Sequence, residues 1–254
     1  MCLKSIVLFS TQDEFYAILV IQKLFSLGFK PCNIVLVRCE SSVFVQNFVK
    51  MYGITLYIYK THRELEKFLK TEVKRMDFIL SFANKIIIKD EITKLCKKAA
   101  INFHPGLLPE YKGFFSTVWA IINGEKRVGY TYHHISNEID GGNILLQKSF
   151  RLYSKDNAFM LYHKIMQDAI FNIGKALKQS SQLGETQNKK GKYYSKDLPY
   201  DGKINPLWTN TKIRDFIRAM IFPPYKSAYV KIKDKKYFVD SFEKYQHILK
   251  EKGE

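Results

Sequence analysis

Over the first hundred residues, the apolar positions alternate between two spacings. Short continuous apolar runs, typical of strands buried on both faces, occur at residues 4–9, 31–40, 54–60, 77–82 and 100–104. Between these runs, apolar residues recur every three or four positions, as they do in helices with one buried side. This second spacing predicts helices at residues 14–27, 41–53, 63–76 and 89–99.

Strands that alternate with helices in this way form a parallel sheet, and ligands bind at the carboxyl ends of its strands. After residue 113 we expect a helix at 117–125, strands at 128–135 and 143–150, and a long helix at 155–181. The sequence therefore predicts an α/β fold with a Rossmann-like, mostly parallel sheet and helices on both faces. We assign residues 1–182 to this N-terminal catalytic domain.

The polar stretch 179–192 is interpreted as the connection to a small C-terminal subdomain at 193–254. That subdomain is expected to contain a helix at 211–220, a turn at Pro223-Pro224 and a β-hairpin at 228–242. Since an exposed hairpin beside an aromatic segment needs a partner, we expect a homodimer.

Composition narrows the function classes. The 41 Lys and Arg residues outnumber the 24 Asp and Glu residues, which gives a net charge of +17. This excess favours anionic ligands or indicates a solvated lysine surface; the lysines are scattered and form no Arg-rich stripe. The absence of a long apolar run and of a signal peptide predicts a cytoplasmic protein without a membrane span. The four cysteines show no CxxC spacing, and no GxGxxG or Walker motif occurs, so neither a metal, a dinucleotide nor ATP is expected.

Three polar residues fall where such a sheet builds its site. Asn102 and His104 lie at a strand end, and Asp140 lies on a turn before two glycines. An imidazole, an amide donor and a carboxylate suit acyl transfer, because preorganised donors stabilise the oxyanion that forms when a nucleophile attacks a carbonyl. The alternative is structural: a turn-forming Asn, a capped His and an Asp that only makes a turn. His133 is expected to be a structural strand residue that touches the site.

The stretch from 101 to 147 resembles the formyltransferases that use 10-formyltetrahydrofolate. The matching segments are NFHPGLLPEYKG at 102–113, WAIINGE at 119–125, GYTYH at 129–133 and DGGNIL at 140–145. The resemblance implies that Asn102, His104 and Asp140 are the catalytic residues. It also implies that the loop at 81–88 receives the pterin through backbone groups, with the cosubstrate-binding residues Phe82, Ala83, Asn84, Lys85 and Ile86. No metal is implied.

The C-terminal segments 201–208, 213–219 and 222–228 resemble the compact end of sugar N-formyltransferases. The resemblance implies transfer to the amine of a nucleotide-linked amino deoxysugar, with a dTDP-linked 3- or 4-amino-dideoxyhexose expected, for surface polysaccharide biosynthesis such as lipopolysaccharide O-antigen. Expected acceptor contacts are Gln12 to the sugar, Phe114 near the site, Arg218 to the diphosphate, and Phe222 or Tyr225 stacked on the base. The alternative for Arg218 is a solvated side chain or pairing with Asp215 or Asp201, and the aromatic residues could instead be core.

Two other functions stay open at this point. The first is formylation of methionyl-tRNA, which the positive charge suits; about 60 residues after Tyr193 are fewer than the C-terminal domain of that enzyme usually has. The second is a nonenzymatic nucleic-acid-binding protein, which requires clustered basic residues beside exposed aromatic side chains. The sequence favours the sugar enzyme, and nucleic acid is not expected as a partner.

Overall fold

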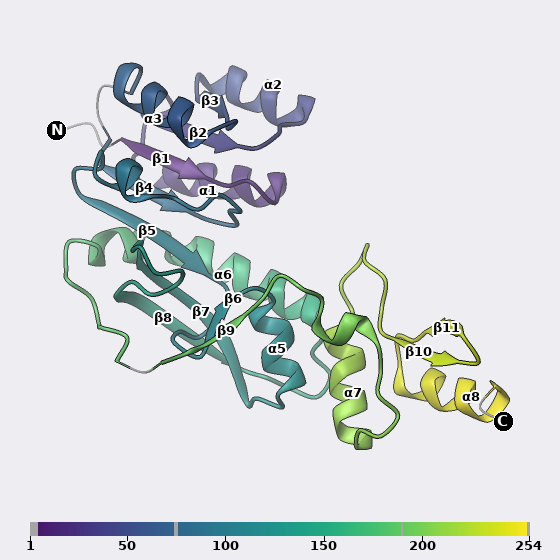
Figure 1. The fold of residues 1–254 in the computed structure, drawn as a ribbon. Coiled ribbons are helices and arrows are strands. Elements are labelled where there is room, and N and C mark those ends of the chain that lie inside the picture. Colours follow the sequence, from purple (N-terminus) through teal and green to yellow (C-terminus); the bar gives the residue numbers. More distant parts are fainter. Residues whose placement is uncertain (1–4, 74–75, 189, 253–254) are drawn as a thin grey trace. The chain divides into compact units, whose positions relative to one another are not determined.

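The computed structural model describes residues 5–73, 76–188 and 190–252 (Figure 1). Its main sheet has seven strands in the order β3-β2-β1-β4-β5-β7-β8. The strands are β1 (Ile6–Phe9), β2 (Ile34–Arg38), β3 (Thr55–Ile58), β4 (Phe78–Ser81), β5 (Ala99–His104), β7 (Arg127–His134) and β8 (Ile144–Arg151). Pairing is parallel from β3 to β5 and antiparallel between β5 and β7. The predicted Rossmann-like, mostly parallel sheet is confirmed.

Several helices begin at a polar residue that caps their first turn. The helices are α1 (Glu14–Ser26), α2 (Val43–Tyr52), α3 (His62–Thr71), α4 (Asp90–Thr93), α5 (Ser116–Ile122), α6 (Ala158–Gln179), α7 (Asn210–Ala219) and α8 (Phe242–Lys252). Asp13, Ser42 and Thr61 each accept a backbone N–H bond as the N-cap of the helix that follows. Gly53 ends α2 with a φ of 67°, a left-handed conformation that glycine adopts without strain.

The helix predicted at 89–99 is wrong beyond its first turn, since α4 ends at Thr93. The backbone N–H groups of Lys97 and Lys98 donate instead to the carbonyls of Met76 and Asp77, at 2.9 Å each. These bonds lead the chain into β5 beside β4. The thiol of Cys96 lies in the same bend, and burial raises its pKa, so that it stays protonated.

The chain divides into two compact units. The first comprises Met1–His104, Thr131–Gln147 and Met166–Lys189, and the second comprises Pro105–Tyr130, Lys148–Ile165 and Lys190–Glu254. One apolar cluster of the first unit lies between β1, β2 and α3 and includes Phe9, Val37 and Leu65, all fully buried. The division of the sequence into 1–182 and 193–254 stays a prediction.

The second unit contains short elements that the sequence pattern did not reveal. β6 (Tyr111–Gly113) pairs in parallel with β9 (Lys192–Tyr194), which begins at the last residue of the stretch 179–192 that was interpreted as a connection. Gly113 is required there, because a Cβ on it would lie 2.3 Å from the Tyr194 carbonyl oxygen. Tyr194 stacks on Trp119 with 4.8 Å between the ring centroids.

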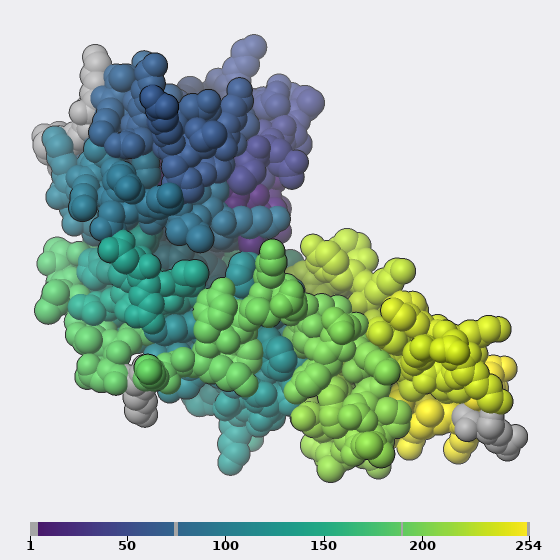
Figure 2. Space-filling model, in the orientation of Figure 1, coloured from purple at the N-terminus to yellow at the C-terminus, as the bar shows by residue number. Residues whose placement is uncertain are grey.

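The predicted hairpin is present as β10 (Tyr229–Ile232) and β11 (Lys235–Phe238), and α8 follows it. Its lysines Lys231, Lys235 and Lys236 are exposed. The hairpin and α8, drawn in yellow, are open to solvent on the face that Figure 2 shows. No helix in the described part of the chain is long and apolar enough to cross a membrane.

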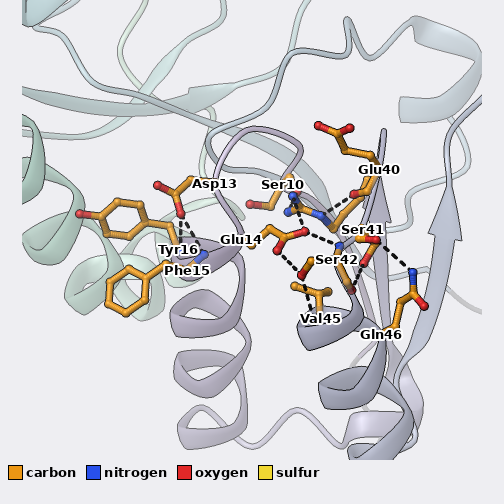
Figure 3. Close-up of polar contacts among 11 residues, drawn as sticks. Ser10, Asp13, Glu14, Phe15, Tyr16, Glu40, Ser41, Ser42, Val45 and Gln46 are labelled. Atoms are coloured by element: carbon orange, nitrogen blue, oxygen red, sulfur yellow. Dashed lines mark hydrogen bonds and ion pairs between the residues drawn. The ribbon is translucent and has the colours of Figure 1, made fainter. Parts of the chain in front are cut away.

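A buried charge joins the carboxyl ends of β1 and β2 to the starts of α1 and α2 (Figure 3). Arg38 is only 1% exposed; its Nη1 donates to the Ser10 carbonyl at 2.6 Å and its Nε to the Glu40 carbonyl at 2.9 Å. Its Nη2 lies 3.6 Å from the Glu14 carboxylate, which also accepts bonds from the backbone and hydroxyl of Ser42. Burial raises the pKa of Glu14, but the Ser42 bonds and the Arg38 charge outweigh it and lower that pKa.

Replacing Arg38 with Ala should lower the free energy of unfolding by about 2–3 kcal/mol, because two carbonyls and a carboxylate lose a buried partner. Urea unfolding followed by circular dichroism near neutral pH measures this. Arg63→Ala, which truncates an exposed arginine on α3, should change stability by less than about 0.5 kcal/mol. Equal unfolding midpoints for the two variants would contradict the assignment.

Candidate active site

The polar cluster at the end of β5 follows from strand periodicity and register. Side chains two apart on a strand share a face, so Asn102 and His104 point to the same side of the sheet. The antiparallel register pairs Asn102 with His133 and His104 with Thr131 on β7. Residues directly opposite in such a pair also share a face, which brings all four side chains together on one side of the sheet.

Asp140 completes the cluster, as the sequence predicted. One carboxylate oxygen, Oδ2, lies 3.3 Å from His104 Nδ1, and the other, Oδ1, lies 3.4 Å from both Asn102 Nδ2 and His133 Nε2. The side chains are largely removed from water, with 4% of His104, 3% of His133 and 11% of Asp140 exposed. Charges and hydrogen bonds at this depth act more strongly than they do in water.

His133 is a member of the cluster that sequence reasoning placed only at its edge. Its Nδ1 lies 2.8 Å from the His134 carbonyl oxygen, which can only accept, so Nδ1 carries the proton. In the neutral ring Nε2 is then an acceptor, and Asn102 Nδ2 donates to it at 3.0 Å. His133 thereby fixes which end of the Asn102 amide faces the cluster. The pairing of β5 with β7 places His133 opposite Asn102, and this register cannot be read from the sequence alone.

The turn that carries Asp140 requires its glycines. A Cβ on Gly142 would lie 1.8 Å from the His134 carbonyl oxygen, so no larger residue fits without moving the backbone. Asp140 itself has a φ of 51°, the left-handed region that Asp tolerates better than most residues. The Asp-Gly-Gly sequence is thus the one local feature that lets a carboxylate approach the strand ends.

The loop after β4, predicted to bind the cosubstrate, is held by its own Asn. The Asn84 carboxamide donates to the Ile86 carbonyl at 2.7 Å and to the Ser81 hydroxyl, and accepts from the Ile86 N–H at 3.0 Å. Phe82 is fully buried and stacks on Phe103 with 4.3 Å between the ring centroids. Phe82 therefore anchors the loop, while Lys85 is exposed.

Thr11 ties this loop to the first strand-helix turn. Its hydroxyl accepts from the Lys85 N–H at 2.7 Å and donates to the Asn84 carboxamide oxygen at 3.1 Å. The backbone N–H groups of Thr11 and Gln12 both donate to the Ala83 carbonyl, at 3.1 and 2.9 Å. Gln12, whose exposed side chain is predicted to meet the acceptor, is thus bonded through its backbone to the predicted cosubstrate loop.

The other predicted acceptor residues lie in the second unit. Arg218 is largely buried; it pairs with Asp215 at 2.8 Å and donates to the carbonyls of Tyr153 and Asp156. A diphosphate would have to compete with these partners. Phe222 packs edge-on against Phe159 and Tyr162. Two aromatic side chains are open to solvent: Phe114, which is 43% exposed, and Tyr225, which is 74% exposed.

Among the described residues, no group of three or more His, Cys, Asp or Glu side chains is arranged to hold a metal ion. The cluster itself offers an amide, two imidazoles and a carboxylate. Such groups stabilise negative charge on oxygen and move protons.

Comparison with known proteins identifies the class. Residues 29–172 match the model of the formyl transferase family. A GDP-perosamine N-formyltransferase from Brucella melitensis is 38% identical over 176 residues, which cover 68% of each chain. The chain belongs to the formyl transferase family, and it is an N-formyltransferase. The alternative of a nonenzymatic nucleic-acid-binding protein is thereby wrong.

Solved structures show the same fold over nearly the whole chain. A sugar N-formyltransferase from a Shewanella species aligns with a TM-score of 0.72 and 22% identity, covering 92% of this chain and 96% of that one. An N-formyltransferase from Helicobacter canadensis, solved with folinic acid and dTDP-3-aminofucose, aligns with a TM-score of 0.73 and 23% identity, covering 92% and 86%.

Thr11→Val keeps the size of the side chain but removes the hydroxyl that holds the Lys85 N–H. We expect the Lys85 amide to exchange with solvent about five to ten times faster, as the loss of about 1 kcal/mol at one bond implies. Hydrogen exchange followed by NMR measures this. Thr71→Val, at the exposed end of α3, should leave that amide unchanged. Equal exchange in Thr11→Val and the unmodified protein would show that the hydroxyl does not hold the loop.

Proposed function

We propose that the protein transfers a formyl group from 10-formyltetrahydrofolate to the amine of a nucleotide-linked amino deoxysugar. The observation that carries the proposal is the Asp140 carboxylate facing Asn102, His104 and His133 at 3.3–3.4 Å. The names of the relatives support the two substrates: one acts on GDP-perosamine, and another was solved with a folate and a dTDP-linked amino sugar.

The proposed reaction needs one bond formed and one broken. The neutral amine of the sugar attacks the formyl carbon, and the carbonyl oxygen takes the negative charge while the new C–N bond forms. Asn102 and protonated His104 donate hydrogen bonds to that oxygen, and Asp140 holds His104 in place from the Nδ1 side. As the bond to N10 breaks, the amine proton leaves by way of Asp140, N10 gains a proton and tetrahydrofolate departs.

The contacts of Asn102 support its proposed role as an oxyanion donor. Its amide nitrogen Nδ2 lies 3.0 Å from His133 Nε2 and 3.4 Å from Asp140 Oδ1. The second contact is long for a hydrogen bond to a carboxylate and is therefore the weaker one. In the proposed reaction a developing oxyanion replaces Asp140 Oδ1 as the acceptor of this weaker bond, while His133 keeps the amide in position.

The loop at 81–88 fits a folate in its proposed role. A pterin presents donors and acceptors along one edge, which backbone groups of a fixed loop can meet. Thr11, Asn84 and the buried ring of Phe82 hold this loop before any ligand binds. Preorganised backbone lowers the entropy lost on binding.

For the acceptor, two nucleotides remain in the proposal. The sequence predicts a dTDP-linked 3- or 4-amino-dideoxyhexose, whereas the 38% identical relative acts on a GDP-linked sugar. A base stacked on the exposed ring of Tyr225 would suit either nucleotide, because every base has a π face.

Replacing Asn102, His104 or Asp140 with Ala should lower kcat at least about a hundredfold, because each change removes a donor or the residue that orients one. The assay follows tetrahydrofolate release, and circular dichroism checks the fold. His247→Ala, which changes an exposed histidine of α8, should keep the wild-type rate. Wild-type rates in the His104 or Asp140 variant would refute the mechanism.

A panel of acceptors tests the substrate class. We expect turnover with GDP-perosamine or with a dTDP-linked 3- or 4-amino-dideoxyhexose, and kcat/KM at least about a hundredfold lower with the free sugar, because the nucleotide supplies binding energy. Charged initiator methionyl-tRNA is tested in the same assay as an alternative acceptor. Turnover with the tRNA alone would overturn the sugar assignment while leaving the family and the catalytic residues intact.

A further inference from the structure

The polar segment after α6 lies against the catalytic turn and does not run free as a connection. Glu185 exchanges two backbone bonds of 2.8 Å with Ile144, at the start of β8. The carboxamide of Asn143 donates to the Leu183 carbonyl at 3.0 Å, and His134 Nε2 lies 3.0 Å from the Gln182 carbonyl. We call residues 182–187 the strap. In Figure 1 the chain leaves α6 and passes beside β8 along this segment.

Gln187 is the residue of the strap that touches the Asp140 turn. Its carboxamide nitrogen donates to the Asp140 carbonyl at 2.9 Å and to the Gly142 carbonyl at 2.7 Å. The orientation of the amide is forced, because a flipped amide would set its oxygen against two carbonyl oxygens. Gln187 is half-buried, whereas its neighbours Thr186 and Asn188 are exposed. Its Oε1 is buried and has no hydrogen-bond partner among the described residues.

These two bonds fix the part of the backbone that aims the carboxylate. The Asp140 carbonyl belongs to the Asp140–Gly141 peptide and the Gly142 carbonyl to the Gly142–Asn143 peptide, so the two bonds fix the first and last peptide planes of the Asp-Gly-Gly turn. They hold Asp140 at its φ of 51°, a conformation that costs about 1 kcal/mol in a non-glycine residue. A rotation of this backbone would swing the carboxylate away from His104 Nδ1, which lies 3.3 Å from it.

We propose that Gln187 is a positioning residue for the transfer: its carboxamide holds the Asp140 turn in the conformation that presents the carboxylate to His104 and Asn102. This inference rests on the proposed function, in which Asp140 takes part in the reaction. A misplacement of about 1 Å at such a group is enough to lower a rate by about a hundredfold.

Gln187→Met keeps the length of the side chain and removes both donors. We expect kcat to fall about 10- to 100-fold while the KM for the folate and for the amino sugar changes less than about threefold, since neither substrate contact is altered. Gln182→Met is the matched control, because its side chain is exposed and only its backbone carbonyl binds in the strap. It should retain kcat within about twofold. If Gln187→Met unfolds, Gln187→Glu replaces it, since a carboxylate of the same shape cannot donate.

A double-mutant cycle separates positioning from general support of the fold. In the Asp140→Ala background there is no carboxylate left to aim, so adding Gln187→Met should lower kcat by less than about twofold further. A further loss as large as in the unmodified protein would show that Gln187 does not act through Asp140, and the proposal would be wrong.

A crystal structure of Gln187→Met tests the inference without any acceptor. We expect the Asp140 carboxylate to move by about 1 Å or more from His104 Nδ1. If the contact and the φ of Asp140 are unchanged, Gln187 is not a positioning residue, whatever the activity. If the carboxylate moves but the unmodified protein formylates no amino sugar, the role of Gln187 stands and the proposed acceptor fails.

Discussion

The meeting of one carboxylate with three strand residues is the interaction on which the rest of the site depends. Asp140 reaches Asn102, His104 and His133 from the turn that follows β7, the strand that runs antiparallel to β5 and pairs His133 with Asn102 and Thr131 with His104. The Ile135 N–H donates to the Ala100 carbonyl at 2.9 Å, so the chain leaves β7 while it is still held against β5. The antiparallel pairing therefore allows β7 to be followed directly by a turn, rather than by a crossover helix. A turn of Asp-Gly-Gly is short enough to bring a charged group to within hydrogen-bonding distance.

Much of the fold and of the site could be predicted from the sequence, because the burial of one or two faces of an element produces a periodic pattern of apolar residues. The strands β1 to β5 and the helices α1 to α3 follow spacings that burial on one or two faces imposes, and Asn102, His104 and Asp140 interrupt those spacings. Elements held by aromatic stacking or by backbone hydrogen bonds show no such pattern. β6 and β9 are three residues long and are stabilised by stacked aromatic rings. The chain after α4 is held by bonds to the carbonyls of Met76 and Asp77, just before β4. His133 was placed at the edge of the site because register decides which strand residues are opposite each other.

The excess positive charge comes mostly from lysines that are scattered along the whole sequence. Several lysines lie over aromatic rings, among them Lys212 over Trp208 at 5.0 Å and Lys236 over Tyr229 at 4.4 Å. In such pairs the ammonium group interacts with the face of the ring, and the aliphatic part of the lysine side chain covers part of that ring. A surface of this kind raises the local concentration of anionic substrates through its net field without defining where they bind.

The residues that maintain the site lie just outside it, in segments with no hydrophobic pattern. Ala83 and Asp140 both have left-handed backbones, with φ of 49° and 51°, and each belongs to a turn fixed by hydrogen bonds from a neighbouring segment. Thr11 holds the turn of Ala83 through Lys85 and Asn84, and Gln187 holds the turn of Asp140 through the carbonyls of Asp140 and Gly142. Left-handed conformations in non-glycine residues are unstable alone, so each needs such a partner. One polar side chain is enough to hold such a turn. The segment that carries this side chain therefore shows no hydrophobic periodicity and resembles a linker in sequence.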